Sequence, residues 1–191
     1  MPRAPLPAHE RQVFRSGHPA SRALPAGRGA DTHRVAPTLD LIVQPRVAVL
    51  ASGAFDPLHY GHIRYIQAAA EQARAENLPL VVAVAPDDYV KRRHPLVQPL
   101  EGRMEMVDAL RWVDFVVPQG SESLARAIRE IRPIYVVKGT DWKVHGLPKD
   151  EVEAVEEVGA TISWVDVSPV SSSELLHAAF WRFADEWVGR T

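Results

Sequence analysis

Two histidines separated by two residues lie in a glycine-containing stretch whose residue types could do chemistry. His59 and His62 fall within residues 52–62, SGAFDPLHYGH, directly after the apolar run at residues 47–51. Imidazole rings can bind a metal, donate hydrogen bonds to a phosphate, or cap a helix. The surrounding residues must decide among these three kinds of chemistry.

A metal site would draw its ligands from Asp56, His59 and His62, which form a D-x-x-H-x-x-H pattern. A protein-held metal needs a closed set of ligands, and the pattern leaves the flanking glycines unexplained. The chain has no cysteine, which excludes thiolate zinc sites, disulfides and cysteine nucleophiles. The stretch also lacks the dinucleotide pattern G-x-G-x-x-G and the P-loop pattern G-x-x-x-x-G-K-[ST]. We therefore expect no protein-held metal.

A phosphate site accounts for more of the stretch. Gly53 lets backbone amides approach a ligand, and a helix that begins near Tyr60 points its free N–H groups at the same place. His59 and His62 would then donate hydrogen bonds to the phosphates. A single histidine at a helix start usually has no chemical role, but the stretch as a whole favours phosphate binding.

The elements that must position these residues follow from the hydrophobic pattern after residue 46. The predicted strands are residues 47–51, 80–85, 114–117, 134–137 and 161–167, and the predicted helices are 60–76, 100–112, 124–131, 151–158 and 171–188. Continuously apolar strands are typical of sheets covered on both faces. We expect an α/β fold, namely a Rossmann-like, doubly wound five-stranded parallel sheet with helices on both faces. Ligands of such sheets bind beyond the carboxyl ends of the strands.

Residues 1–45 differ in composition from residues 46–191. They are rich in proline and arginine, contain no lysine and show no apolar periodicity. We interpret them as an extended or disordered N-terminal arm, with residues 38–43 able to pack on the edge of the domain formed by residues 46–191. A transit peptide is the alternative, but the prolines oppose an amphipathic helix.

Bulk properties limit the partners. The chain has 191 residues, 46% of them hydrophobic, and a formal net charge of −2, which gives no general attraction to nucleic acid or anionic membranes. Its longest apolar runs have strand length, far short of the roughly 20 residues that span a bilayer. We expect a cytoplasmic protein without nucleic-acid or membrane partners.

The stretch at 52–62 resembles the G-x-F-D-x-x-H-x-G-H signature of the cytidylyltransferase-like nucleotidylyltransferases. The matching residues are Gly53, Phe55, Asp56, His59, Gly61 and His62. The resemblance implies that His59 and His62 are catalytic, because in that family they contact the triphosphate and stabilise the transition state as pyrophosphate leaves. It also implies nucleotide binding by the residues Ser52, Gly53, Ala54 and Phe55.

Further boxes follow in the family's order. Lys91 lies where the family has a basic loop facing the phosphates, and PLEGRM at 99–104 resembles the P-L-E-x-R-M of the bacterial ADP-heptose synthase adenylyltransferase domain. VKGTDW at 137–142 is similar to V-K-G-G-D-Y of that domain and to G-D-D-W of glycerol-3-phosphate cytidylyltransferases. VSSS at 170–173 resembles a triphosphate-binding I-S-T-T box. The implied site residues are Lys91 for catalysis, Lys138, Gly139, Asp141, Ser171, Ser172 and Ser173 for the nucleotide, and Arg103 and Trp142 for the acceptor.

Each box also has a purely structural interpretation. The basic turn around Lys91 can be a solvated charge run. Arg103 can pair with neighbouring glutamates on a helix surface. The serines at 171–173 can cap a helix without any ligand. Their joint order, and the place of Lys138 at the end of a strand, favour the functional interpretation.

The resemblance implies a nucleotidyltransferase that moves a nucleoside monophosphate, most simply AMP from ATP, to a sugar phosphate such as heptose 1-phosphate. It implies Mg²⁺ held mainly by the triphosphate, and a homodimer. The alternative acceptor class is a polyol phosphate with CTP as donor, which Trp142 favours. A catalytically inactive nucleotide-binding regulator is a second alternative, although the histidines and lysines are retained. An aminoacyl-tRNA synthetase is disfavoured, because no K-M-S-K-S loop is visible.

Overall fold

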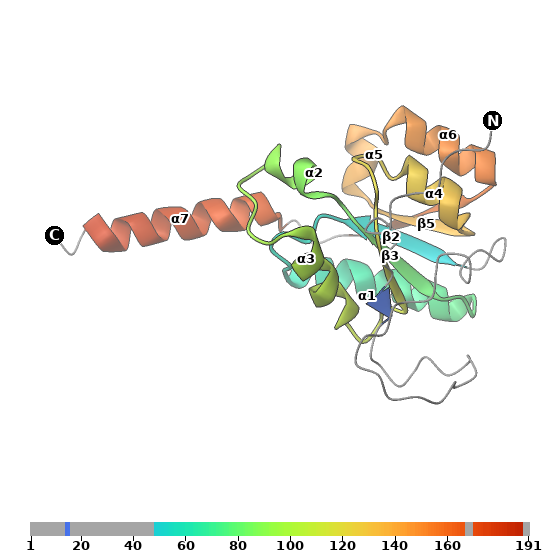
Figure 1. Ribbon diagram of the computed structural model, residues 1–191, viewed down its shortest axis with the longest axis horizontal. Coiled ribbons are helices and arrows are strands. Elements are labelled where there is room, and N and C mark those ends of the chain that lie inside the picture. Colours follow the sequence, from blue (N-terminus) through green and yellow to red (C-terminus); the bar gives the residue numbers. More distant parts are fainter. Residues whose placement is uncertain (1–13, 16–47, 167–169, 189–191) are drawn as a thin grey trace.

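The computed structural model describes residues 14–15, 48–166 and 170–188. Their centre is a six-stranded sheet in the order β1-β4-β3-β2-β5-β6 (Figure 1). Five strands run parallel: β2 (Val49–Gly53), β3 (Leu80–Val84), β4 (Phe115–Pro118), β5 (Tyr135–Gly139) and β6 (Thr161–Val165). The predicted five-stranded parallel sheet is confirmed, with each strand within two residues of its expected place.

One strand was not predicted. β1 (Phe14–Arg15) lies within the N-terminal arm and pairs antiparallel with β4 at the edge of the sheet. The proposed domain boundary after residue 45 and the proposed packing of residues 38–43 lie outside the described residues.

The helices cover both faces of the parallel sheet, because the buried strands alternate their side chains between two clusters. Val49 and Ala51 of β2 pack with α1 and α3, whereas Leu50 packs with α4 and α6. The helices are α1 (Tyr60–Ala75), α2 (Asp87–Lys91), α3 (Leu100–Asp108), α4 (Ala125–Ile131), α5 (Asp141–His145), α6 (Lys149–Val158) and α7 (Ser172–Val188). This alternation explains why the strands read as continuous apolar runs.

The short helices α2 and α5 were not predicted, since one turn of helix leaves no periodic pattern to detect. The structure also ends α3 at Asp108, four residues before the predicted end. The other predicted helices agree with the structure within two residues at each end. The largest of these differences is at α6, which starts at Lys149, two residues before its predicted start.

β2 lies at the centre of the strand order, with β3 on one side and β5 on the other. The chain therefore moves outward from β2 through β3 to β4 and then returns to β5. Such a reversal of direction is where open α/β sheets place their ligands, beyond the carboxyl ends of the strands. The stretch at 52–62 and the Lys138–Gly139 step are both at that end.

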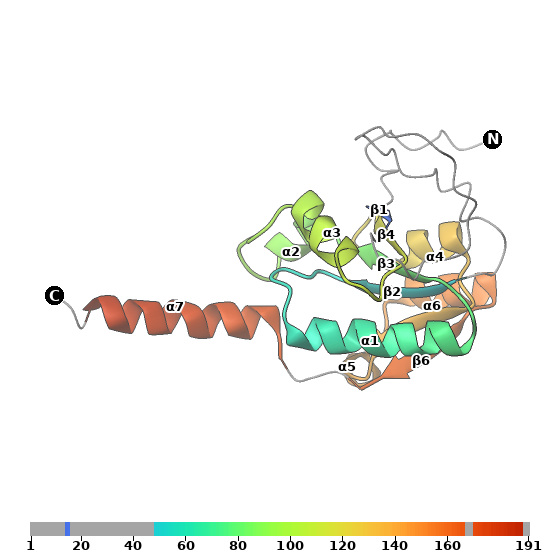
Figure 2. The ribbon, with the colours of Figure 1, turned by 90° about the horizontal axis from the view of Figure 1, so that it is seen from below.

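α7 is unlike the other helices, because it projects away from the sheet and its layers (Figure 2). Its side chains include the exposed residues Leu175, Phe180, Trp181 and Phe183. Within the described part of the chain, no helix is long and apolar enough to cross a membrane.

Candidate active site

His59 is the N-cap of α1 and uses its ring in place of the usual serine or aspartate. Its Nδ1 accepts hydrogen bonds from the amides of Gly61 (3.1 Å) and His62 (3.4 Å). A neutral ring that accepts at Nδ1 carries its proton on Nε2. Two of the α1 amides that were predicted to meet phosphate therefore already donate to His59. The positive end of the α1 dipole would instead act on a ligand through the Nε2–H of His59.

His62 lies against His59 with the ring centroids 3.8 Å apart and the planes 20° from parallel. The ring of Phe55 also packs against His62 in a T-shaped arrangement, with the ring centroids 5.0 Å apart and the planes at 67°. Burial, followed by the nearby His59, lowers the pKa of His62 to about 3, and burial also lowers the pKa of His59. Both rings are therefore neutral at pH 7 in the absence of an anion.

The Nδ1 atom of His62 is buried and has no hydrogen-bond partner among the described residues. A buried polar atom without a partner costs free energy, so its presence needs an explanation. Two stacked neutral imidazoles would bind a proton more readily once a polyphosphate lies beside them, because an opposite charge favours the charged form of a base. The pair is therefore suited to an anionic ligand.

Gly53 is required by the protein itself. Phe55 adopts a left-handed backbone conformation (φ 55°) that folds its ring back over Gly53, where a Cβ would lie only 2.8 Å from the ring carbon Cζ. The predicted reason for this glycine was access for a ligand. The structure gives a different one, since Phe55 occupies the space beside it.

Asp56 is fully buried and holds the turn to the loop before α3. Its two carboxylate oxygens accept hydrogen bonds from the amides of Val97 and Gln98, each at 2.8 Å. The metal alternative required this carboxylate as a ligand. In the described residues no group of three or more histidine, cysteine or acidic side chains is arranged to hold a metal.

Arg103 is fully buried and joins three loops at the carboxyl edge of the sheet. Its Nε donates to the carbonyl of Gln98 (3.0 Å), its Nη1 to those of Ala54 (2.6 Å) and Ala85 (2.8 Å), and its Nη2 to Asp87 (2.6 Å). This placement differs from the predicted contact with substrate, because the guanidinium has no exposed surface. It also differs from the alternative of a surface ion pair. The geometry favours a role in shaping the turn.

β2 and β5 separate at their carboxyl ends. Their pairing stops at Leu50 and Val136, whereas β2 remains paired with β3 as far as Gly53. The hydroxyl of Tyr65 enters the gap, where it donates to the carbonyl of Val137 (2.8 Å) and accepts from the amide of Ser52 (3.2 Å). Burial raises the pKa of this hydroxyl, so it remains a donor. Ser52 is thus held by protein through its amide.

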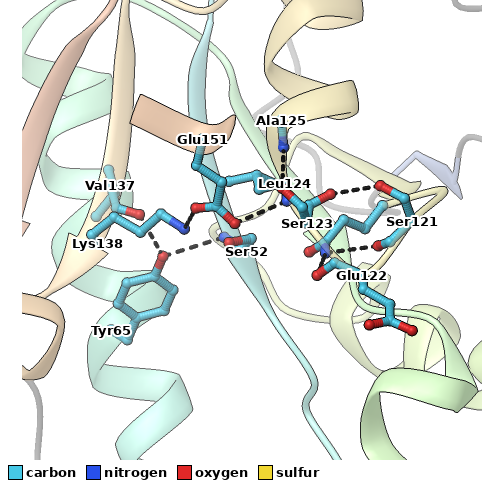
Figure 3. A network of polar contacts seen from close by, with 11 residues as sticks. Ser52, Tyr65, Ser121, Glu122, Ser123, Leu124, Ala125, Val137, Lys138 and Glu151 are labelled. Atoms are coloured by element: carbon cyan, nitrogen blue, oxygen red, sulfur yellow. Dashed lines mark hydrogen bonds and ion pairs between the residues drawn. The ribbon is translucent and has the colours of Figure 1, made fainter. Parts of the chain in front are cut away.

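Lys138, the residue before the last of β5, is buried. Its Nζ lies 2.6 Å from an oxygen of Glu151, and the other oxygen of Glu151 accepts from the amide of Leu124 at 2.9 Å (Figure 3). The half-buried Trp142 presents its ring 5.4 Å from the same Nζ. Glu151 was not predicted. Its only signal in the sequence is its position in the first turn of α6, where the helix dipole stabilises an acidic side chain.

The remaining residues of this box differ in exposure. Gly139 is buried at the end of β5, and Asp141 lies exposed in the first turn of α5. Ala54 is half-buried, and its carbonyl is the acceptor for Arg103.

The basic turn at Lys91 is exposed. Lys91 lies 3.5 Å from Asp88, Arg92 pairs with Glu122, and the guanidinium of Arg93 lies 3.6 Å from the ring centroid of Tyr89. These contacts hold the cations on the surface, and no described contact joins Lys91 to the histidines. Its predicted catalytic role stays a prediction.

The serine box meets the histidine turn. Ser171 and Glu174 form a capping box: the serine Oγ accepts from the amide of Glu174 (3.1 Å), and the glutamate accepts from the amide of Ser171 (3.3 Å). Ser172 donates its hydroxyl to the carbonyl of Pro57 at 3.1 Å. The start of α7 therefore lies against the turn at 52–62, 115 positions earlier in the chain, while Ser173 is exposed.

Comparisons with known proteins identify the family of the chain. A model of the cytidylyltransferase-like family matches residues 50–178. The bifunctional protein HldE of Hydrogenovibrio crunogenus is 44% identical over 99 residues, covering 50% of this chain and 20% of that protein. HldE of Chromohalobacter salexigens is 40% identical over 119 residues, covering 60% of this chain and 23% of that protein. The chain thus spans about a fifth of the length of these relatives.

Among solved structures, the lipopolysaccharide core biosynthesis protein from Thermoplasma volcanium GSS1 superposes with a TM-score of 0.52 at 23% identity. The match covers 65% of this chain and 98% of that one. This likeness supports the Rossmann-like fold, and the family match confirms the resemblance predicted from residues 52–62.

Proposed function

The chain belongs to the cytidylyltransferase-like family, and from this premise we propose that it transfers a nucleoside monophosphate from a nucleoside triphosphate to a phosphorylated sugar or polyol, releasing pyrophosphate. The observation that carries the proposal is the stacked pair His59 and His62 at the start of α1, with the buried, unpartnered Nδ1 of His62. A pair of this kind at the carboxyl edge of a parallel sheet suits a polyphosphate.

In the proposed reaction an acceptor phosphate oxygen attacks the α-phosphorus, and the bond from that phosphorus to the β-phosphate bridging oxygen breaks. Pyrophosphate leaves with the bonding electron pair. The acceptor phosphate is already ionised at pH 7, so the reaction needs neither a general base nor a protein nucleophile. The protein's part is to align the two reactants and to stabilise charge on the phosphate oxygens.

His59 and His62 supply the donors nearest the turn in this proposal. His59 offers Nε2–H, since its Nδ1 is committed to the amides of α1. Lys138 supplies a fixed positive charge from β5, and Lys91 supplies one from the exposed turn. The nucleotide is proposed to lie over the carboxyl ends of β2 and β5, with Gly139, Asp141 and the serines of residues 171–173 around it.

Mg²⁺ fits this site as an ion carried by the triphosphate. The described residues offer no cluster of ligands to hold it, and Asp56 has both oxygens committed to amides. Magnesium commonly keeps several waters and binds through substrate phosphates. Bound in that way, it would offset charge on the departing pyrophosphate.

ATP and a heptose 1-phosphate are the proposed substrates, on the basis of the PLEGRM and VKGTD boxes. Because Arg103 is buried and bonds within the protein, the PLEGRM box indicates the fold more than the identity of the acceptor. Trp142 remains the residue that favours CTP and a polyol phosphate. A nucleoside triphosphate substrate agrees with the proposed cytoplasmic location.

The test is release of pyrophosphate from each of ATP, CTP, GTP and UTP in the presence of Mg²⁺ and a panel of phosphorylated sugars and polyols. We expect release with ATP and a heptose 1-phosphate. Release only with CTP and glycerol 3-phosphate would replace the proposed substrates and keep the reaction type. No release with any pair would overturn the proposed enzyme.

We also propose that α7 pairs with α7 of a second copy. Phe180, Trp181 and Phe183 are 64%, 53% and 61% exposed, and Leu176 precedes Phe180 by one helical turn. Leu176, Phe180 and Phe183 follow the four-then-three spacing of a helix-pairing stripe. An isolated helix of this length is marginal in water, so its partner should be available as soon as the chain folds. A second copy meets that condition.

The area agrees with a dimer. An aromatic side chain buries about 150–250 Å², so the exposed parts of Phe180, Trp181 and Phe183 offer on the order of 350 Å² per copy. Two copies therefore offer roughly 700 Å², and the neighbouring leucines bring the total toward the roughly 1,000 Å² of a specific interface.

Sedimentation at micromolar concentration tests the pairing. We expect a dimer for the wild type and a monomer for Phe180→Ser. Val144→Ser, which removes an apolar side chain 84% exposed on α5, is the matched control and should stay dimeric. A monomeric wild type, or a dimer that survives Phe180→Ser, would overturn the proposal.

A further inference from the structure

The buried pair of Lys138 and Glu151 has a composition that stability alone does not explain. The two side chains are 6% and 7% exposed, and their charged atoms lie 2.6 Å apart. Removing two charges from water is costly, and an apolar pair of similar volume in such a place is often as stable or more stable. An ion pair that is buried except for a small exposed part, at a sheet edge, therefore suggests a use for the charge.

The hydrogen bonds of the pair are unequal. Glu151 uses both oxygens, one for Lys138 and one for the amide of Leu124 at the start of α4. An ammonium group has three N–H donors. One goes to Glu151, and no second hydrogen-bond acceptor is found for Nζ in the described part of the chain, although the Trp142 ring lies 5.4 Å away. The lysine is thus fixed in place while two donors stay available.

A chain of contacts ties this ammonium to the histidine turn (Figure 3). Lys138 follows Val137, whose carbonyl accepts a hydrogen bond from the Tyr65 hydroxyl. The same hydroxyl oxygen accepts a hydrogen bond from the amide of Ser52. Ser52 leads directly into the turn that ends at His62. The end of β5 and the end of β2 are therefore held at a set separation, with the cation on one and the histidines on the other.

We propose that Glu151 is a positioning residue, which holds the Lys138 ammonium in a fixed orientation toward the phosphates of the triphosphate. The inference rests on the proposed function. Lysine is a flexible point charge, and immobilising such a side chain before binding removes an entropic cost that the ligand would otherwise meet. Glu151 itself touches no ligand in this scheme. Its effect passes through Lys138.

Calorimetric binding of inorganic tripolyphosphate in the presence of Mg²⁺ tests the inference without assuming a base. Glu151→Gln keeps an oxygen for the Leu124 amide and removes the negative charge. We expect it to bind roughly tenfold more weakly than the wild type, the factor expected for one side chain that must be immobilised on binding. Glu157→Gln, on the exposed side of the same helix and paired with Arg129, is the matched control and should bind as the wild type does.

A double-mutant cycle separates positioning from a general structural effect. Lys138→Met should weaken binding at least as much as Glu151→Gln, and adding Glu151→Gln to Lys138→Met should weaken it no further, because the glutamate acts only through the lysine. The double variant Lys138→Met with Glu151→Gln, which keeps an oxygen for the Leu124 amide, should unfold near the wild-type temperature and still bind poorly. Binding would then be lost without a loss of stability.

Two results would overturn the inference while leaving the proposed function intact. These are wild-type binding by Glu151→Gln, and additive losses in the double-mutant cycle, which indicate a purely structural glutamate. A wild type that binds no tripolyphosphate and releases no pyrophosphate would instead overturn the proposed function and this inference with it.

Discussion

The turn at residues 52–62 and helix α7 touch through one hydrogen bond, from Ser172 to the carbonyl of Pro57, and are otherwise opposites. In the turn, Phe55 and Asp56 are fully buried, and both oxygens of Asp56 have partners inside the protein. On α7, three aromatic side chains are more than half exposed. The turn is therefore held in shape by contacts within its own domain, whereas α7 presents a surface that this domain does not cover. Changes in the turn should therefore alter folding and chemistry, and changes on α7 should alter association.

The largest expected effect is on the arginine that holds the turn. Arg103→Met removes four hydrogen bonds and leaves Asp87 and three carbonyls without their donor. Losing these hydrogen bonds and the ion pair with the half-buried Asp87 should cost about 3–5 kcal/mol. Urea unfolding would measure the loss. Arg182→Met on α7, where the arginine is exposed, should change stability by less than about 0.5 kcal/mol, and equal losses would break the comparison.

Two phenylalanines give a matched pair. Phe55→Ala removes a fully buried ring and opens a cavity over Gly53, which should cost about 4 kcal/mol in urea unfolding. Phe180→Ala removes a ring that is 64% exposed. At concentrations low enough to keep the chain monomeric, it should cost less than about 0.5 kcal/mol. A costly Phe180→Ala under those conditions would mean that α7 is packed within its own chain.

A third comparison uses two histidines. In the proposed reaction His62 donates to the triphosphate, so His62→Ala should lower turnover by about 10²–10³-fold, the usual loss for one preorganised donor. His177→Ala, which removes a hydrogen bond to Trp181 on α7, should leave turnover unchanged. Steady-state pyrophosphate release measures both variants. Unchanged turnover in His62→Ala would make that histidine structural.

The smallest effect is on the pH dependence of stability. His62 has a folded-state pKa of about 3, below its ordinary value of 6.5. The unfolded chain therefore binds the proton first, and stability falls as the pH drops from about 6.5 toward 3. By pH 5 the loss is at most about 2 kcal/mol. His62→Asn should reduce this slope in urea unfolding at a series of pH values, and an unchanged slope would show that other groups cause it.

Sequence predicted the parts of this molecule that local pattern controls. The five parallel strands were found because each is a short apolar run with punctuation on both sides, and α1 and α6 because their apolar residues repeat with helical spacing. β1 was missed, since Phe14 and Arg15 show no pattern and their pairing depends on the distant β4. α2 and α5 were missed because each is a single turn.

The candidate site divides in the same way. The histidine turn was found because its residues are consecutive, and their spacing is itself the signal. Glu151 and Tyr65 were missed because their roles arise from partners 13 and 72 positions away. Arg103 was assigned to substrate or to surface glutamates, since neighbours in sequence were the only partners visible there. Burial of an arginine is decided by loops that the sequence does not place.

The hydrogen bonds of Arg103 also bear on the order in which the chain folds. Arg103 binds carbonyls 18 and 49 positions before it in the chain, at Ala85 and Ala54. Contacts between distant positions form late, and synthesis delivers the N-terminal part of the chain first. A nascent chain therefore carries the complete histidine motif well before the residue that gives its turn a shape. We therefore expect the turn to take its final shape only after α3 has been made and has docked.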